Sequence, residues 1–165
     1  MWEKNAVFNP SAKVDRQALT MFSDGTERFE LPNLEESKYD QAFDEFELLG
    51  FPLSSPFDLI DGEVEGNILG NNLKQLLGKR IEIIGYYIER KHVTTSNRKL
   101  MAFGTWIDRE GHFFDTVHFP PSFARFPFKG IGCYRIQGKV VEDFEFPSIE
   151  VDFMERLAYV KDERY

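Results

Sequence analysis

The fold is decided by residues 80–108, which read RIEIIGYYIERKHVTTSNRKLMAFGTWID. Residues 80–95 are rich in β-branched and aromatic residues, and residues 99–108 are mostly apolar, so a strand is predicted in each range, with Gly85 as a bend in the first. Between them, the polar run Ser96-Asn97-Arg98 predicts a turn. The two strands are therefore expected to pair as a β-hairpin.

Three more strands are expected further along the chain. The turn at residues 108–111 leads to apolar, strand-like ranges at residues 112–119, 131–142 and 148–157, with Gly138 as a second bend. Residues 120–128 predict a short crossover that holds one helical turn at the proline pair. Five strands with a crossover between the third and the fourth predict a mainly β fold, the five-stranded OB-fold Greek-key barrel. An SH3-like barrel is the structural alternative.

The residues before this barrel show turn and helix patterns in place of strand patterns. Residues 1–34 contain the turn signals Asn9-Pro10 and Asp24-Gly25, and they are expected to form an extended arm. Residues 35–78 are interpreted as a helix over 35–49 that ends at Gly50, a proline-rich connector and a helical turn over 73–77. The helix carries one apolar stripe formed by Tyr39, Ala42, Phe43, Phe46 and Leu49. The OB-fold domain then spans residues 79–157, and residues 158–165 form a tail.

Charge is distributed unevenly along this acidic chain of 165 residues, whose formal net charge is −8. Residues 79–139 hold 11 Lys and Arg against 5 Asp and Glu, whereas residues 1–78 hold 6 against 15 and residues 140–165 hold 3 against 8. A basic middle between acidic flanks is typical of phosphate binding, although ordinary variation in surface charge gives the same pattern. With one cysteine, no long apolar run and no secretion signal, we expect a cytoplasmic protein without an intrachain disulfide or a membrane partner.

Two stretches resemble a known family. The connector sequence ELLGFPLSSPF at residues 47–57 resembles the LGFYLSGHPL signature of bacterial DNA polymerase III alpha subunits, with Pro52 in place of the Tyr. The sequence KLMAFGTWID at residues 99–108 is similar to that family's K-x-MAF-x-T-x-x-D strand. The resemblance implies the carboxy-terminal OB-fold region of such a subunit. The palm, fingers and phosphoesterase domains lie upstream in that family, so this chain is expected to have no polymerase activity.

The predicted first hairpin is the main candidate for nucleic-acid binding. Phosphate oxygens need cationic and hydroxyl donors, and the loop between the first two OB strands is where single strands are gripped. The hairpin offers such donors at Arg90, Lys91, His92, Thr94, Arg98 and Lys99. The expected ligand is single-stranded DNA or a primer–template. The alternative is a solvated hairpin tip with ordinary surface charge.

Aromatic side chains and further cations extend this candidate site. Bases stack on exposed rings, and the rings on the second and third strands belong to Phe103, Trp106, Phe113, Phe114, His118 and Phe119. Most rings of a small barrel face its core, so an interior position is the alternative for each of them. Alternation separates Phe103 from Trp106, and we expect Phe103 outward and Trp106 inward. Arg135 and Lys139, with Arg125 and Lys129, would extend a positive groove along the fourth strand, unless they are scattered solubilising charges.

A short peptide in the arm is a candidate for binding another protein. Gln17, Leu19, Met21 and Phe22 resemble the glutamine-initiated peptide by which bacterial polymerases hold the sliding clamp. An extended peptide of this kind inserts its apolar side chains into a groove of its partner. The alternative is that this segment docks on its own domain. The resemblance also implies other replisome subunits as partners, and a protein-binding OB module without DNA binding is the second functional hypothesis.

Enzymatic chemistry finds no support in the spacing of reactive residues. His92, His112 and His118 show no metal-ligand spacing with one another or with Cys133, so no metal or cofactor is expected. No phosphate-binding loop or nucleophile-elbow motif occurs. Cys133 is interpreted as a small buried residue. A hydrolase is therefore the least favoured hypothesis.

Overall fold

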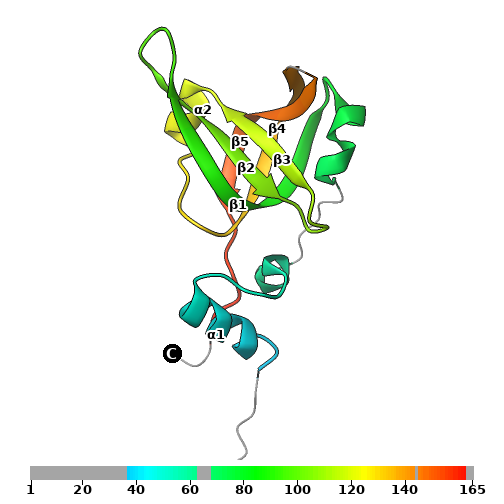
Figure 1. Ribbon diagram of the computed structural model, residues 1–165, viewed down its shortest axis with the longest axis vertical. Coiled ribbons are helices and arrows are strands. Elements are labelled where there is room, and N and C mark those ends of the chain that lie inside the picture. Colours follow the sequence, from blue (N-terminus) through cyan, green and yellow to red (C-terminus); the bar gives the residue numbers. More distant parts are fainter. Residues whose placement is uncertain (1–36, 63–67, 144, 163–165) are drawn as a thin grey trace, which may run out of the picture. The chain divides into compact units, whose positions relative to one another are not determined.

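Five strands close into one barrel in the computed structural model, which describes residues 37–62, 68–143 and 145–162 (Figure 1). The strands are β1 (Arg80–Thr94), β2 (Leu100–Ile107), β3 (Phe113–His118), β4 (Cys133–Asp143) and β5 (Phe146–Arg156). Their order around the barrel is β1-β2-β3-β5-β4, with β3 and β5 parallel and β1 closing on β4. This order, with helix α2 (Pro120–Arg125) between β3 and β4, confirms the predicted OB-fold and excludes the SH3-like alternative.

Closure depends on strand β1, which is long enough to serve two partners. Its first half pairs with β4 up to Tyr86, and its second half pairs with β2 from Tyr86 onward. Gly85 lies at this change of partner, where a Cβ atom would stand 2.6 Å from Cζ of Phe114. Gly138 lies at the register shift between β4 and β5, where a Cβ atom would collide with the carbonyl oxygen of Glu150. Both glycines are therefore required by close approach, as expected for bends in a small barrel.

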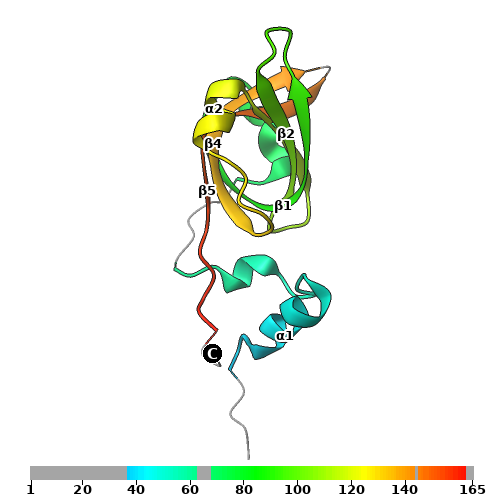
Figure 2. The ribbon, with the colours of Figure 1, turned by 90° about the vertical axis from the view of Figure 1, so that its left-hand side faces the viewer.

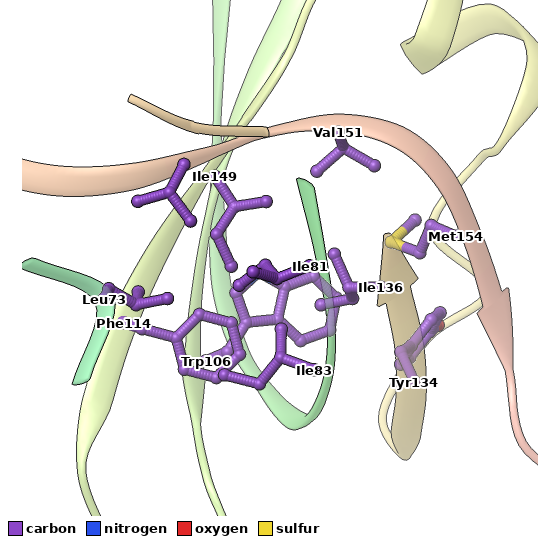
Figure 3. Packing of buried hydrophobic residues seen from close by; sticks show 11 residues of the cluster. Leu73, Ile81, Ile83, Trp106, Phe114, Tyr134, Ile136, Ile149, Val151 and Met154 are labelled. Atoms are coloured by element: carbon purple, nitrogen blue, oxygen red, sulfur yellow. The ribbon is translucent and has the colours of Figure 1, made fainter. Parts of the chain in front are cut away.

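The interior is filled around one tryptophan. Trp106 is fully buried, stacks on Phe128 at a ring-centroid distance of 5.7 Å and lies edge-on to Tyr134. Figure 3 shows it among Ile81, Ile83 and other apolar side chains contributed by several strands. Leu73 joins this core from the 3-10 helix η3 (Gly70–Leu76), the predicted helical turn. One continuous core is thus built from the barrel and η3.

A polar network also lies inside the barrel. The indole N–H of Trp106 donates to Thr116 Oγ1 at 2.7 Å, and the Thr116 hydroxyl lies 3.2 Å from the Gly104 carbonyl and 2.9 Å from His118 Nε2. His118 is fully buried, and this burial lowers its pKa to about 4. The imidazole is therefore neutral at physiological pH, and it cannot act as a cation for DNA.

The predicted helix exists but is shorter than expected. Helix α1 (Asp40–Leu49) begins five residues later than predicted, after a turn in which the Asp40 N–H bonds to the Ser37 carbonyl. It ends at Gly50 in the left-handed conformation, as predicted. Ala42 is buried, but Leu49 at the end of the predicted stripe is 49% exposed.

Glu45 takes part of the buried face of α1 instead. Its carboxylate accepts the backbone N–H groups of Leu53 at 2.6 Å and Ser54 at 3.3 Å. These hydrogen bonds, the one from Leu53 foremost, lower the pKa of Glu45 against the opposing effect of burial. An acidic side chain thereby fixes the connector against the helix.

A short antiparallel bridge, which we call the clasp, joins the segment that precedes the barrel in sequence to the segment that follows it. After the 3-10 helix η2 (Pro56–Leu59), Ile60 bridges Tyr159 in antiparallel fashion, and the Val160 N–H donates to the Leu59 carbonyl at 2.8 Å. Beside the clasp, Cys133 is fully buried, and burial raises its pKa to about 12. This confirms its interpretation as a buried residue.

The predicted arm over residues 1–34 lies outside the described residues. Among the described helices, none combines the length and apolarity that a membrane span requires.

Candidate nucleic-acid interface

The hairpin between β1 and β2 projects beyond the barrel in both views (Figures 1 and 2). Its turn is closed by the Thr95 N–H, which donates to the Lys99 carbonyl at 2.8 Å, and by Thr95 Oγ1, which accepts the Lys99 N–H at 3.1 Å. Arg98 adopts the left-handed conformation at φ 58°. The side chains of Arg98 and Lys99 are exposed at the tip of this hairpin.

Strand pairing divides the predicted hairpin residues between two sides. Lys91 pairs with Phe103, which points outward, whereas Arg90 and His92 pair with Gly104 and Ala102, whose positions face the interior. Arg90 accordingly places its guanidinium 5.5 Å from the Phe128 ring centroid, and His92 lies 5.4 Å from that of Phe123. Thr94 follows Arg90 and His92 by alternation. Among the predicted hairpin residues that lie on strand β1, Lys91 alone is on the same side as Phe103.

The outward residues of β1, β2 and β3 form a surface that we call the outer face. Register places them in three cross-strand rows: Lys91, Phe103 and Val117 in the first, Glu89, Thr105 and Asp115 in the second, and Ile107 and Phe113 in the third. Phe103 is 38% exposed and Trp106 is fully buried, which confirms the orientations predicted for β2. A depression on this face is lined by Glu89, Arg90, Lys91, Phe103, Thr105 and Asp115.

The other aromatic candidates separate into surface and core. Phe113 is 65% exposed on the outer face, and Phe119 is also exposed where α2 begins. Phe114 and His118 are buried, so their rings belong to the interior and cannot stack with a ligand. Phe113 is therefore a stronger platform than the sequence pattern indicated.

The cations predicted to extend the groove along the fourth strand lie elsewhere. β4 neighbours β1 and β5 in the closed order, so neither Arg135 nor Lys139 borders β2 or β3. Arg135 forms ion pairs with Glu155 at 2.8 Å and with Glu82 at 3.5 Å, which neutralise it locally. Arg125 lies over the ring of Phe126 in α2. The structure does not bring these cations together with the outer face.

The β4–β5 turn also bears on the candidate site, and its acidic residues are visible in the sequence. Glu142 and Glu145 are exposed there beside Phe146, whose side chain is 76% exposed. The β1–β2 hairpin is basic and this turn is acidic. A polyanion on the barrel is therefore drawn toward the hairpin and repelled from the turn.

Asp108 is a positioning residue that sequence reasoning missed. Its buried carboxylate accepts backbone N–H groups from Gly70 at 2.7 Å, His112 at 2.8 Å and Glu110 at 2.9 Å, and it lies 3.2 Å from His112 Nδ1. Burial acts to raise the pKa of Asp108, but these hydrogen bonds outweigh it and lower the pKa. The sequence signal for this role was an Asp at the start of the tight turn before Gly111, because Asp side chains at turn starts accept backbone N–H groups of the turn. Asp108 ties the β2–β3 turn to η3 and so fixes the end of the outer face.

A second surface feature is apolar. A groove runs between the connector and the barrel, lined by residues 51–57 together with Tyr86, Ile88 and Ile107. Leu53 on its rim is 71% exposed, and Phe51 and Ile88 are also exposed. Within the described ranges, no three His, Cys, Asp or Glu side chains gather in a way that would hold a metal ion.

The fold and the outer face thus define an OB-fold domain with a basic hairpin beside an aromatic surface. No protein-family model matches the chain, and no curated protein matches its sequence. Among solved structures, the chain is similar to U. maydis Replication protein A bound to ssDNA, at 14% sequence identity and a TM-score of 0.39. The similarity covers 62% of this chain and 82% of that chain. The strand order, and not this similarity, defines the fold.

Proposed function

We propose that this chain is a non-catalytic nucleic-acid-binding module that holds single-stranded DNA across its outer face. The observation that carries the proposal is the cross-strand pair of Lys91 and Phe103, which sets a cation and an exposed ring side by side below a tip with two more cations. Single strands are held by this combination, because phosphates meet the cations and bases stack on the rings.

The arrangement also suggests how the strand would lie. Lys91, Arg98 and Lys99 would follow the phosphates along the hairpin, and Phe103 would take one base at about 1–3 kcal/mol. Glu142 and Glu145, which are exposed at the β4–β5 turn, would repel phosphates from that turn. The backbone of the strand is therefore expected to run on the hairpin side, with its bases directed over β2 and β3.

Salt dependence tests this proposal. With three cations on phosphates, affinity for a labelled single strand is expected to fall about 20-fold between roughly 50 and 200 mM salt, because each contact releases condensed counterions. Fluorescence anisotropy with the full chain measures this, and a primer–template duplex added as competitor reports which form of DNA is preferred. Absence of binding at the low salt concentration, or an affinity that salt leaves unchanged, would contradict the proposal.

We further propose that the chain is the OB-fold region of a replicative DNA polymerase III alpha subunit, acting in the cytoplasm with other replisome subunits. The support is the resemblance of residues 47–57 and 99–108 to that family. In that setting, Gln17, Leu19, Met21 and Phe22 would tether the polymerase to the sliding clamp. These four residues lie outside the described part of the chain, so this tether rests on the sequence pattern alone.

A peptide tests the tether directly. A synthetic peptide spanning residues 12–25 is expected to bind a bacterial sliding clamp with a dissociation constant on the order of micromolar, because its apolar residues would enter a groove while Gln17 bonds at the rim. Isothermal titration calorimetry measures the affinity. A Phe22→Ala peptide is expected to bind at least about tenfold more weakly, whereas the matched Thr20→Ala peptide retains affinity. No detectable heat with the unaltered peptide would remove the tether.

A protein-binding module without DNA binding is the second candidate function. The observation that favours it is the apolar groove beside the connector, with Phe51, Leu53 and Ile88 exposed on it. This alternative predicts negligible DNA affinity even at low salt, so the anisotropy experiment separates the two functions.

A further inference from the structure

Two carboxylates lie within the surface on which we propose that DNA binds. Glu89 and Asp115 flank Thr105 in the second row of the outer face, directly beside the row of Lys91 and Phe103. The same side chains line one depression. Arg90 and Lys91 line the depression as well. Phosphates would be attracted to these two cations, whereas the carboxylates favour a part of the ligand that donates hydrogen bonds.

The carboxylate of Asp115 is held in place and still has acceptor capacity. Thr105 Oγ1 donates to Asp115 Oδ1 at 2.8 Å, which fixes the orientation of the group. Within the described part of the chain, neither Asp115 Oδ2 nor the Glu89 carboxylate accepts a hydrogen bond. An ionised carboxylate accepts through both oxygens, so these atoms remain available to a ligand.

Exposed rings stand on both sides of this row. Phe103 lies in the row nearer the hairpin tip, and Phe113 lies in the row beyond, so the carboxylates occupy the space between two stacking platforms. Neighbouring rows on one face of a strand are about 7 Å apart. The hydrogen-bonding edge of a base stacked on Phe103 is therefore within reach of the carboxylates.

We propose that Asp115, assisted by Glu89, selects bases that present amino groups, namely cytosine, adenine and guanine, against thymine and uracil. This inference rests on the proposed function. Cytosine offers its exocyclic amino group, a donor that Asp and Glu accept, whereas thymine presents a carbonyl oxygen at the same position. A carboxylate attracts the first group and repels the second.

The test compares oligo-dC with oligo-dT of the same length, about 12 nucleotides, at low salt. Both are pyrimidine strands of equal charge, so phosphate contacts cancel in the ratio of the two affinities. By fluorescence anisotropy the full chain is expected to bind oligo-dC about 5- to 10-fold more tightly. In the Asp115→Asn variant this ratio is expected to fall to about 1, because an amide also donates to the thymine carbonyl.

Two control variants separate selection from general effects. Glu47→Gln removes one exposed carboxylate on α1 and should leave the ratio unchanged. Phe103→Ala should weaken both oligonucleotides together. Equal affinities in the unaltered protein, or a ratio that Asp115→Asn preserves, would overturn the selection while DNA binding stands. No binding of either oligonucleotide would overturn the proposed function and this inference together.

Discussion

Replacement of Lys91, Arg98 and Lys99 by alanine is expected to weaken the binding of single-stranded DNA about 30-fold at low salt. The three side chains are exposed on the β1–β2 hairpin, and each would lose one phosphate contact worth roughly 0.5–1 kcal/mol. The slope of log affinity against log salt should also fall by about 2, since each single-strand phosphate contact contributes roughly 0.7. Fluorescence anisotropy over a range of salt concentrations measures both effects.

A matched variant controls for net charge in this experiment. Replacing Lys74, Lys79 and Lys139 by alanine removes the same number of exposed cations from η3 and the β4 side of the barrel. This variant should bind with nearly the affinity of the unaltered protein, and thermal melting should report unchanged stability for both variants. Equal weakening in the two variants would mean that the hairpin is not the specific site. Lys139 would then count among the residues that contribute to DNA binding.

The Asp108→Ala variant is expected to lose about 3 kcal/mol of unfolding free energy, because three backbone N–H donors would lose a buried, charged acceptor. Urea denaturation measures this loss. Asp108→Asn keeps an acceptor oxygen and should lose less. Asp58→Ala, an exposed carboxylate on η2, is the matched control and should change stability by less than about 0.5 kcal/mol. A loss in Asp108→Ala no larger than that of the control would contradict the role assigned to this residue.

The same residue predicts part of the acid response. The pKa of Asp108 is lowered in the folded protein, so the unfolded chain takes up its proton at a higher pH than the folded chain does. The stabilisation is therefore fully present above the ordinary pKa of an aspartate, about 3.9, and it is lost as pH falls below that value through the lowered pKa. In Asp108→Asn this part of the pH dependence should be absent.

Most of the barrel follows from local patterns. Alternation along β2 separated Phe103 from Trp106, because successive side chains of a strand point to opposite faces, but only the closed barrel shows that Phe103 is the outward one. Gly85 and Gly138 could be expected at bends, although only the structure identifies the atoms that exclude a Cβ there. The late start of α1 could not be predicted, since it depends on the turn that Asp40 makes with Ser37.

The candidate binding surface was less predictable than the fold. Arg135 and Lys139 belong to the same basic stretch of sequence as the hairpin cations, but they lie on β4, which does not border β2 or β3. This separation follows from the closed strand order, which the sequence does not show. Arg90 was separated from Lys91 by alternation along β1, which sequence reasoning applied to β2 but not to the hairpin. His118 follows the buried Phe114 and Thr116 by alternation along β3, a signal that sequence reasoning did not use. The ring of Phe128 packs against it at a centroid distance of 4.7 Å.

The bridge between Ile60 and Tyr159 has a mechanical consequence. Residues 61–158 form a loop whose two ends meet in antiparallel hydrogen bonds, from Asp61 to Ala158 and from Val160 to Leu59. A pulling force applied through the flanking chain therefore acts on this pair of bonds and on the contact between Pro56 and Cys133 of β4. Tension between neighbouring segments is expected to open the bridge while strands β2 and β3, which do not contact it, keep their register.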